Sequence, residues 1–335
     1  MLYVGIDVHY RVSVVCILDE NGRRVKTVTV KGHWQKLLTF LEGLGQPFRV
    51  CYEASTGYGW LHDRLARIAA SVQVAHPGQL RLIFRSKRKH DRVDAEKLAK
   101  LLFLGEVPQV HVPRQDVRSW RSLIEYRAGL LRDRTGTKNR IRALLRTHAI
   151  VAPKGLWTKK GLTWLETVEL PSAMEAVQRD MLLEKLRMHD RMLKRVETVL
   201  KGIADAHPGV ALLMTIPGVG IRTAEAVVAY IDDPKRFKSV KAIGAYFGLV
   251  PCEDTSAGKR RLGHITQEGP ATVRRLLTEA AWQSIRRSPD ARAFFERVMQ
   301  GQADRKKIAV VATAHRLLRA MLAMLRSGEA WREAA

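Results

Sequence analysis

"LYVGIDVHYRVSVVCILDENGRRVKTVTV", residues 2–30, contains three runs of β-branched and other apolar side chains. The runs cover residues 2–8, 12–19 and 24–30, and side chains of this kind favour extended backbone. Asn21-Gly22 joins the last two runs, and this dipeptide is a strong short-range hairpin signal. The stretch therefore predicts three consecutive antiparallel strands at the start of a sheet.

The pattern then changes to helices that alternate with strands. The expected elements are helices near 33–44, 58–70, 78–85 and 91–104 and strands at 48–54 and 72–76. Strands separated by helices form parallel β-α-β units, so the first three strands should continue into a mixed sheet covered by helices. The sequence therefore predicts an α/β fold for residues 1–108, followed by all-α segments.

Two long helices are predicted in the middle of the chain, near 114–150 and 172–205. Their imperfect heptads of apolar residues suggest that they pair as an antiparallel coiled-coil arm, which we assign to residues 109–208. The first helix is basic: residues 114–146 include ten Lys and Arg against three Asp and Glu. Residues 209–335 are expected to form a helical domain with one long loop between "YFGLVP" and "GPATVRRLL".

The charge balance points to a polyanionic partner. The 335 residues include 58 Lys and Arg against 33 Asp and Glu, a formal net charge of +25. Such an excess destabilises a compact state by self-repulsion, and nucleic acid is the polyanion that best explains it.

The three cysteines are far apart and the histidines lack ligand spacing, so we expect no zinc site. No apolar stretch approaches the roughly 20 residues that span a bilayer, which predicts a cytoplasmic protein without membrane contact, nucleoid-associated when acting.

Four carboxylates are candidates for a metal site. Asp91 and Asp94 share one helix face inside the basic segment "KHDRVDAEKLAK" (89–100), Asp7 lies within a strand, and Glu53 ends the fourth strand. If the first and fourth strands are neighbours, these side chains converge, and oxygen ligands suit Mg²⁺ or Mn²⁺. Two such ions can clamp a phosphodiester. The alternative for Asp91 is an ordinary helix cap.

Other residues are candidates for contact with nucleic acid because they carry positive charge or let the backbone approach a phosphate. They are Lys87, Arg88, Lys89, Arg92, Gly218, Gly220, Lys259, Arg260, Arg261, Arg274 and Arg275. The two glycines belong to "TIPGVGIRTAEAVVAYI" (215–231), which is similar to a helix-hairpin-helix, although a tight interhelical turn explains them equally well. Ser256, in the loop 252–269, is either a nucleophile activated by nearby cations or an ordinary turn residue.

Together these segments resemble the DEDD-type insertion-sequence transposases, which are related to the Piv and MooV invertases and include bridge-RNA-guided recombinases. "YVGIDVHYRVSVVCILDENG" resembles the family motif around its first aspartate, at Asp7. "VCYEASTGYGWL" places the glutamate at Glu53, and "SKRKHDRVDAEKLAKLL" places the paired aspartates at Asp91 and Asp94. "IPGVGIRTAEAVVAYIDDPKRFKSVKAIGAYFGLVP" and "TSAGKRRLGHITQEGPATVRRLL" resemble the transposase domain, whose serine falls on Ser256.

The resemblance implies a Holliday-junction-resolvase-like (RuvC-like) RNase H fold, a coiled-coil linker and a helical domain that carries the serine. It implies DNA recombination through a serine nucleophile beside a Mg²⁺-binding tetrad (Asp7, Glu53, Asp91 and Asp94). It also implies a dimer or tetramer and a structured noncoding RNA that pairs with target and donor DNA. The sequence departs from the family pattern at three places. His90 stands where the pattern favours Thr or Asn, and Ala257 stands where it favours Gly. "TQEG" replaces the more usual Ser-Lys-x-Gly and so lacks one positive charge.

Two other functions fit parts of the sequence. A metal-dependent junction nuclease would use the carboxylates without serine chemistry, because water would attack the phosphate. A non-enzymatic nucleic-acid-packaging protein would explain the charge of +25, but it gives no reason for acidic residues in strands beside basic segments.

Overall fold

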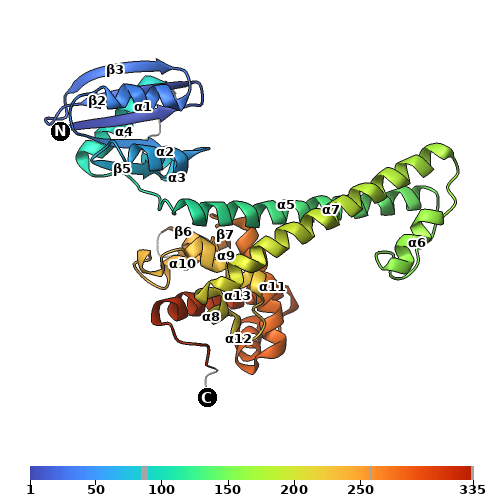
Figure 1. Ribbon diagram of the computed structural model, residues 1–335. Helices are drawn as coiled ribbons and strands as arrows, with labels where there is room; N and C mark the ends of the chain where they lie inside the picture. Colours follow the sequence, from blue (N-terminus) through green and yellow to red (C-terminus); the bar gives the residue numbers. More distant parts are fainter. Residues whose placement is uncertain (84–89, 257–258, 333–335) are drawn as a thin grey trace. The chain divides into compact units, whose positions relative to one another are not determined.

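The computed structural model describes residues 1–83, 90–256 and 259–332 of the chain. The chain separates into two compact units, an N-terminal unit (Met1–Arg118) and a C-terminal unit (Ser119–Ala335), and each is described by itself. Figure 1 shows the order of their elements along the chain. The division into three parts at residues 108 and 208 stays a prediction.

The N-terminal unit is built on a five-stranded mixed sheet. Its strands are β1 (Leu2–Val8), β2 (Val12–Leu18), β3 (Arg24–Lys31), β4 (Phe48–Glu53) and β5 (Ser71–Ala75). The spatial order is β3-β2-β1-β4-β5; the first three strands pair antiparallel, and β4 and β5 join in parallel. This RNase H-like order confirms the predicted mixed sheet. At the β2–β3 turn Gly22 has a φ of 73°, which the Asn-Gly signal anticipates.

Helices cover both faces of this sheet. They are α1 (Trp34–Glu42), α2 (Tyr58–Leu65), α3 (Pro77–Ile83) and α4 (Asp91–Leu104). On one face Val4 and Ile6 of β1 share a buried cluster with residues of α1 and α2, including Leu37 and Leu61. On the other face Cys51 of β4 packs with leucines of α3 and α4. Because side chains alternate along a strand, the odd-numbered positions of β1 face α4.

Gly5 lets α4 lie directly on β1. A Cβ atom built at Gly5 would stand 2.2 Å from the carbonyl oxygen of Ala95 and 2.3 Å from the amide nitrogen of Ala99, both in the α4 backbone. Any larger residue would push the helix away, so this glycine sets the distance between β1 and α4. Asp7, two positions further along β1, lies on the same face as Gly5.

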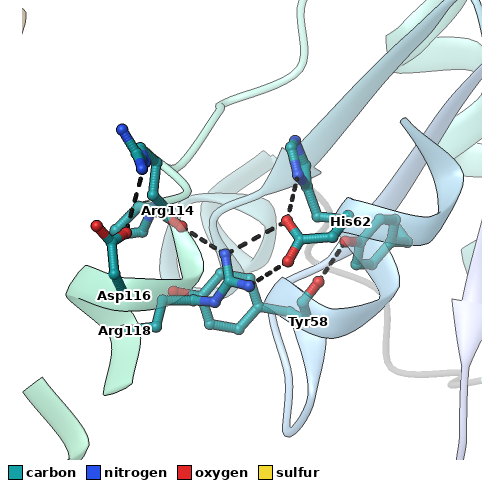
Figure 2. Close-up of polar contacts among 8 residues, drawn as sticks. Tyr58, His62, Arg114, Asp116 and Arg118 are labelled. Carbon is teal, nitrogen blue, oxygen red and sulfur yellow. Dashed lines mark hydrogen bonds and ion pairs between the residues drawn. The ribbon is translucent and has the colours of Figure 1, made fainter. Parts of the chain in front are cut away.

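The first turn of helix α5 (Gln115–Thr147) is attached to α2 by the Arg118 side chain (Figure 2). The Arg118 guanidinium donates to both carboxylate oxygens of Asp63 and to the carbonyl of Pro113. Gly59 leaves room for it, since a Cβ there would meet Arg118 Nε at 2.5 Å. The Tyr52 hydroxyl also donates to the Tyr58 carbonyl oxygen at 2.6 Å. These contacts fix α2 on the sheet.

In the C-terminal unit α5 and α7 (Ala173–Ala206) run side by side (Figure 1). Arg127 Nε donates to Glu197 Oε1 at 2.8 Å, and Arg134 Nε lies 2.7 Å from Asp190 Oδ1. Beyond these ion pairs an apolar cluster joins both helices to α6 (Lys159–Thr167), which contributes the buried Leu165. Residues 153–168, which connect the two long helices and contain Trp157 and Trp164, therefore pack against the helix pair.

The rest of the C-terminal unit is a helical region, as predicted. Its α-helices are α8 (Pro208–Met214), α9 (Ile221–Ile231), α10 (Ala242–Tyr246), α11 (Ala271–Arg287), α12 (Pro289–Met299) and α13 (Lys306–Ser327). They enclose one large buried cluster that also takes in Trp120 and Ile124 of α5. Glu125 of α5 accepts hydrogen bonds from Tyr230 and Thr272, each at 2.7 Å, so the start of α5 is joined to α9 and α11.

The expectation of one long loop after "YFGLVP" is corrected by the structure. Residues Pro251–Ser256 form β6 and residues Lys259–Ile265 form β7, and the two strands pair antiparallel. Their sequences, PCEDTS and KRRLGHI, contain few β-branched residues. The side chains that the structure describes in these strands are largely exposed. The usual apolar alternation of a strand is therefore missing, which is why the sequence suggested a loop.

The expectation that no apolar stretch is long enough to span a membrane is also corrected. Residues Ala303–Ser327, a 3-10 turn followed by α13, are long and apolar enough by composition to cross a membrane, but half of the apolar stretch is buried inside the protein. Its buried residues Ala314, Leu318 and Met321 belong to the core of the C-terminal unit. We therefore interpret α13 as a core helix of the C-terminal unit.

Candidate metal centre and nucleic-acid interface

Three side chains at the carboxyl end of β1, the central strand of the N-terminal sheet, have ligand atoms close enough to share a metal ion. Asp7, His9 and Asp91 each offer one such atom, and these atoms lie within 4.8 Å of one another. Asp7 Oδ2 is 3.4 Å from His9 Nε2. The Asp7 side chain is 19% exposed and that of His9 is 55% exposed, so the group opens to solvent on the histidine side.

The start of α4 supplies the second part of this group. His90 precedes the helix, and its Nδ1 accepts a hydrogen bond from the Arg92 amide at 3.2 Å. The helix cap is therefore His90, and the alternative that Asp91 caps the helix is wrong. Asp91 and Asp94 lie in the first helical turn, where negative charge is favourable. Asp94 Oδ1 also contacts Lys97 Nζ at 3.3 Å.

The electrostatics of Asp7 reflect its neighbours. Burial raises the pKa of Asp7; the charge and hydrogen bond of His9 lower it, and the nearby charges of Asp91 and Asp94 raise it further. The net direction is upward. A carboxylate that is hard to ionise beside two others of the same sign gains strongly from a cation, which would turn their repulsion into ligation.

Glu53 lies at the end of β4, the strand next to β1. The parallel pairing of the two strands ends at Ile6 and Tyr52, the residues just before Asp7 and Glu53. Glu53 is exposed and shares the face of Cys51, which packs toward α4. It is not in the group of three that the described residues form. Its place as a fourth ligand stays a prediction.

His9 is a member of this group in addition to the carboxylates that the sequence predicts as ligands. Its signal was present in the sequence, because strand alternation puts Asp7 and His9 on one face. Imidazole is compatible with Mn²⁺, while Mg²⁺ prefers oxygen ligands. The donor set therefore fits a divalent cation, with carboxylates as the main ligands.

The turn before α9 contains the two glycines of the helix-hairpin-helix interpretation. Gly218 has a φ of 92°, and a Cβ there would stand 2.4 Å from the Ser284 amide nitrogen of α11. The Ser284 hydroxyl donates to the Pro217 carbonyl oxygen at 2.6 Å. Gly218 thus serves close packing between helices. At Gly220, the N-cap of α9, no described heavy atom lies within 4 Å of such a Cβ, so this helix start is open.

The serine is placed by its strand. Ser256 ends β6 and is paired with Lys259 at the tip of the β6–β7 hairpin. The side chains of Ser256, Lys259 and Arg260 lie outside the part of the chain that the structure describes, as do residues Lys87, Arg88 and Lys89.

The other candidate cations differ in how far they are engaged. Arg92 and Arg261 are exposed, and Arg275 pairs with Glu279 at 2.7 Å on the surface. Arg274 instead donates to the carbonyl oxygens of Phe247, Glu268 and Gly269. Arg274 therefore holds the segment after β7 against α10 and α11.

Comparison with known proteins assigns the chain to a family. The DEDD-type model of IS110 transposases matches residues 4–150, and the model described as "Transposase IS116/IS110/IS902 family" matches residues 210–296. The putative transposase y4qE of Sinorhizobium fredii is 31% identical over 84% of this chain and 71% of its own length. The chain belongs to the IS110/IS116/IS902 transposase family. This transposase is thus an enzyme, as its motifs indicated.

Other relatives cover nearly all of this transposase. A probable family 20 transposase of Pseudomonas aeruginosa is 27% identical over 92% of the chain and 88% of its own length. The transposase for insertion sequence element IS1111A of Coxiella burnetii is 27% identical over 84% of this chain and 78% of its own length. The DEDD-type match spans β1, β4 and α4, and a domain of this type implies the use of a divalent metal.

Proposed function

We propose that this transposase cuts and exchanges DNA strands at a divalent-metal site, Mg²⁺ or Mn²⁺, held by Asp7, Glu53, Asp91 and Asp94, with Ser256 as nucleophile. The observation that carries the proposal is the approach of Asp7 and Asp91, whose ligand atoms lie within 4.8 Å of one another although both groups are acidic. Such a pair in a chain of net charge +25 is best explained by a bound cation.

When bound, the cation would polarise the scissile phosphodiester and offset the negative charge that develops on it. The protein supplies the positioning. Gly5 holds α4 against β1 and so keeps Asp91 near Asp7. His9 contacts Asp7 from the solvent side and favours its ionised form, because its charge and hydrogen bond lower the pKa of Asp7.

We propose that the reaction passes through a covalent bond between Ser256 and the DNA. The Ser256 hydroxyl oxygen attacks phosphorus and a serine–phosphate bond forms, while the bond from phosphorus to one deoxyribose oxygen breaks. The serine proton passes to water and the leaving oxygen takes up a proton. A hydroxyl at the end of another strand then attacks the phosphoserine, which restores Ser256 and joins the new DNA strand.

Charged surfaces would hold the nucleic acid partners, target and donor DNA and a structured noncoding bridge RNA. Lys87, Arg88 and Lys89 precede the α4 sequence that carries Asp91 and Asp94, and Arg92 lies in its first turn. Lys259, Arg260 and Arg261 follow Ser256 in the sequence and are the corresponding candidates there. Arg275 of α11 and the open N-terminus of α9 at Gly220 are further candidates for phosphate contacts. The cytoplasm, at the nucleoid, is the compartment where such partners meet.

We also propose that the α5–α7 pair is a coiled-coil arm through which the protein forms a dimer or tetramer. Six exposed apolar residues support this: Met174, Val177, Met181, Met188, Val199 and Ile203. Their spacing places all six on one side of α7, away from the leucines that face α5. An apolar stripe of this length on a soluble protein favours a second copy of the helix pair as its cover.

Replacement of Ser256 tests the serine chemistry. Purified transposase would be incubated with DNA containing the element ends and with RNA transcribed from the noncoding DNA that flanks the reading frame. We expect Ser256→Ala to lose strand cleavage and the denaturant-resistant protein–DNA adduct, whereas Thr255→Ala, which removes the neighbouring hydroxyl, retains both. Asp7→Asn should lose cleavage as well.

The same assay separates the alternatives. A metal-dependent junction nuclease would still cut DNA after Ser256→Ala, because water is its nucleophile. A packaging protein would cut nothing in any form, and Asp7→Asn would leave its DNA binding intact. Cleavage that survives Ser256→Ala would refute the serine step and leave the acidic site standing.

A further inference from the structure

An exposed cluster of aromatic rings lies at the edge of the N-terminal unit. We call Tyr10, Trp34 and Trp60 the aromatic platform. The ring centroids of Tyr10 and Trp34 are 5.9 Å apart, and those of Trp34 and Trp60 are 5.8 Å apart. Tyr10 is 63% exposed and Trp60 is 41% exposed. Large aromatic side chains usually bury most of their area, so a cluster that stays open suggests a ligand.

The platform borders the acidic site. Tyr10 follows His9 in the chain, and Trp34 Nε1 donates to the His9 carbonyl oxygen at 3.0 Å. The Trp34 ring also lies against Gly57, which belongs to the loop that follows Glu53. A Cβ atom at Gly57 would stand 2.3 Å from this ring. The segments that carry Asp7, His9 and Glu53 therefore continue directly into residues that contact Trp34.

Two arginines and a histidine lie beside the platform. The His33 ring meets Tyr10 edge-on at 5.1 Å, the Arg64 guanidinium lies over Trp60 at 5.4 Å, and Arg11 is exposed beside Tyr10. Aromatic faces with cations between them are the combination that binds single-stranded nucleic acid, because bases stack on the rings while phosphates meet the charges. A purely apolar partner would leave these cations without solvent or counter-charge.

We propose that the aromatic platform stacks unpaired bases of the DNA strand whose phosphate lies at the acidic site. This inference rests on the proposed function, since it assigns the nucleotides next to the cut. A base inserted between Trp34 and Trp60 would need rings about 7 Å apart, twice the roughly 3.4 Å base spacing. Their centroids are closer than that, so bases stack on the outward faces of Tyr10 and Trp60.

The Arg64 contact does not prevent this. A cation–π contact at an exposed site contributes about 0.5–1 kcal/mol, whereas stacking of a base on an aromatic ring contributes about 1–3 kcal/mol. A base therefore displaces the Arg64 guanidinium from the Trp60 ring. The freed guanidinium is then available to a backbone phosphate of the same strand.

Binding of labelled single-stranded and duplex DNA of one sequence, measured by fluorescence anisotropy in metal-free buffer with the full-length protein, tests the platform. We expect Tyr10→Ala and Trp60→Ala each to weaken single-strand binding about tenfold and to leave duplex binding unchanged. Tyr10→Phe and Trp60→Phe should bind as the wild type does. Tyr126→Ala, which removes a 49% exposed tyrosine from α5, is the matched control and should change nothing.

A second measurement reports stacking itself. The fluorescent base 2-aminopurine, placed at successive positions of the single strand, should be quenched where it stacks on Trp60 and regain fluorescence with Trp60→Ala. Three results would overturn the platform: unchanged single-strand binding in both alanine variants, an equal loss for duplex DNA, or a larger loss for an RNA of the same sequence.

Failure of the platform can be told from failure of the proposed function. If both alanine variants bind single strands normally while Asp7→Asn abolishes cleavage, the platform is wrong and the catalytic proposal stands. If Asp7→Asn still cleaves DNA while the alanine variants lose single-strand binding, the platform stands and the catalytic proposal is wrong.

Discussion

Replacement of Gly5 by alanine perturbs the spacing between β1 and α4, on which the acidic site depends. The new Cβ would stand 2.2 Å from Ala95 O and 2.3 Å from Ala99 N, where ordinary contact begins at 3.4 Å. Both obstructing atoms belong to the helix backbone, and Ala95 and Ala99 are fully buried, so no side-chain rotation relieves the clash. The helix must retreat by about 1 Å.

That displacement has two consequences with different magnitudes. Overpacking of a tight core costs typically 1–3 kcal/mol, and a backbone obstruction should reach the upper end, about 3 kcal/mol. The same shift carries Asp91 and Asp94 away from Asp7, because all of α4 moves as a helix. A misplacement of about 1 Å in a catalytic arrangement can cost about a hundredfold in rate.

Urea unfolding, titration with Mn²⁺ alone and strand cleavage measure these effects in one variant. Gly43→Ala is the control, because its Cβ would lie 3.5 Å from the nearest atoms and its φ of −76° suits any residue. We expect Gly5→Ala to lose stability, Mn²⁺ affinity and cleavage together, and Gly43→Ala to lose none of them. A Gly5→Ala protein that is less stable but binds Mn²⁺ and cuts DNA normally would refute the link between this contact and the site.

Two further predictions concern pH. Since burial and the charges of Asp91 and Asp94 raise the pKa of Asp7 above its ordinary 3.8, ionised Asp7 destabilises the metal-free fold, and stability is lost as pH rises through the folded pKa. Asp7→Asn should raise the free energy of unfolding at pH 7 in metal-free buffer, with the gain vanishing near pH 3; an equal gain at both pH values would contradict this. Burial likewise raises the pKa of Glu225 from 4.5 to about 7 against the opposing charge of Arg222. The free energy of unfolding should therefore fall by about 3 kcal/mol as pH rises from 4.5 to above 7. Glu225→Gln should flatten that part of the curve in urea titrations, and an unchanged slope would show that Glu225 ionises freely in the fold.

Much of the N-terminal unit follows from local sequence. The β-branched runs, the Asn-Gly turn and the alternation that puts Gly5 and Asp7 on one face all act within a few residues, so they can be predicted without tertiary contacts. The same alternation puts His9 on the face of Asp7, but carboxylates are the more usual ligands of Mg²⁺, so the sequence alone does not single out the imidazole. The helix cap at His90 was missed for a similar reason, since imidazole nitrogen is a less common acceptor there than Asp oxygen.

The C-terminal unit was harder to predict because its decisive contacts join distant segments. The backbone of Ser284 in α11 comes so close to residue 218 that only glycine fits there, and no neighbouring residue in the sequence predicts that contact. The β6–β7 hairpin carries charged residues at most positions, which removes the apolar signal of a strand. Helix α13 is apolar enough to cross a membrane by composition. Most of its apolar side chains are buried in the protein because other helices pack around it, and the sequence of α13 alone does not contain that information.

The acidic site also gives a reason for the close packing of α4 on β1. Asp7, Asp91 and Asp94 repel one another, and their repulsion acts to separate β1 from the start of α4. The contact of Gly5 with Ala95 and Ala99 opposes that separation one helical turn further along. A cation that binds the carboxylates removes the repulsion, so binding and close packing favour the same position of α4 and must strengthen each other. Metal affinity should therefore report the quality of the β1–α4 contact even in variants whose ligands are all intact.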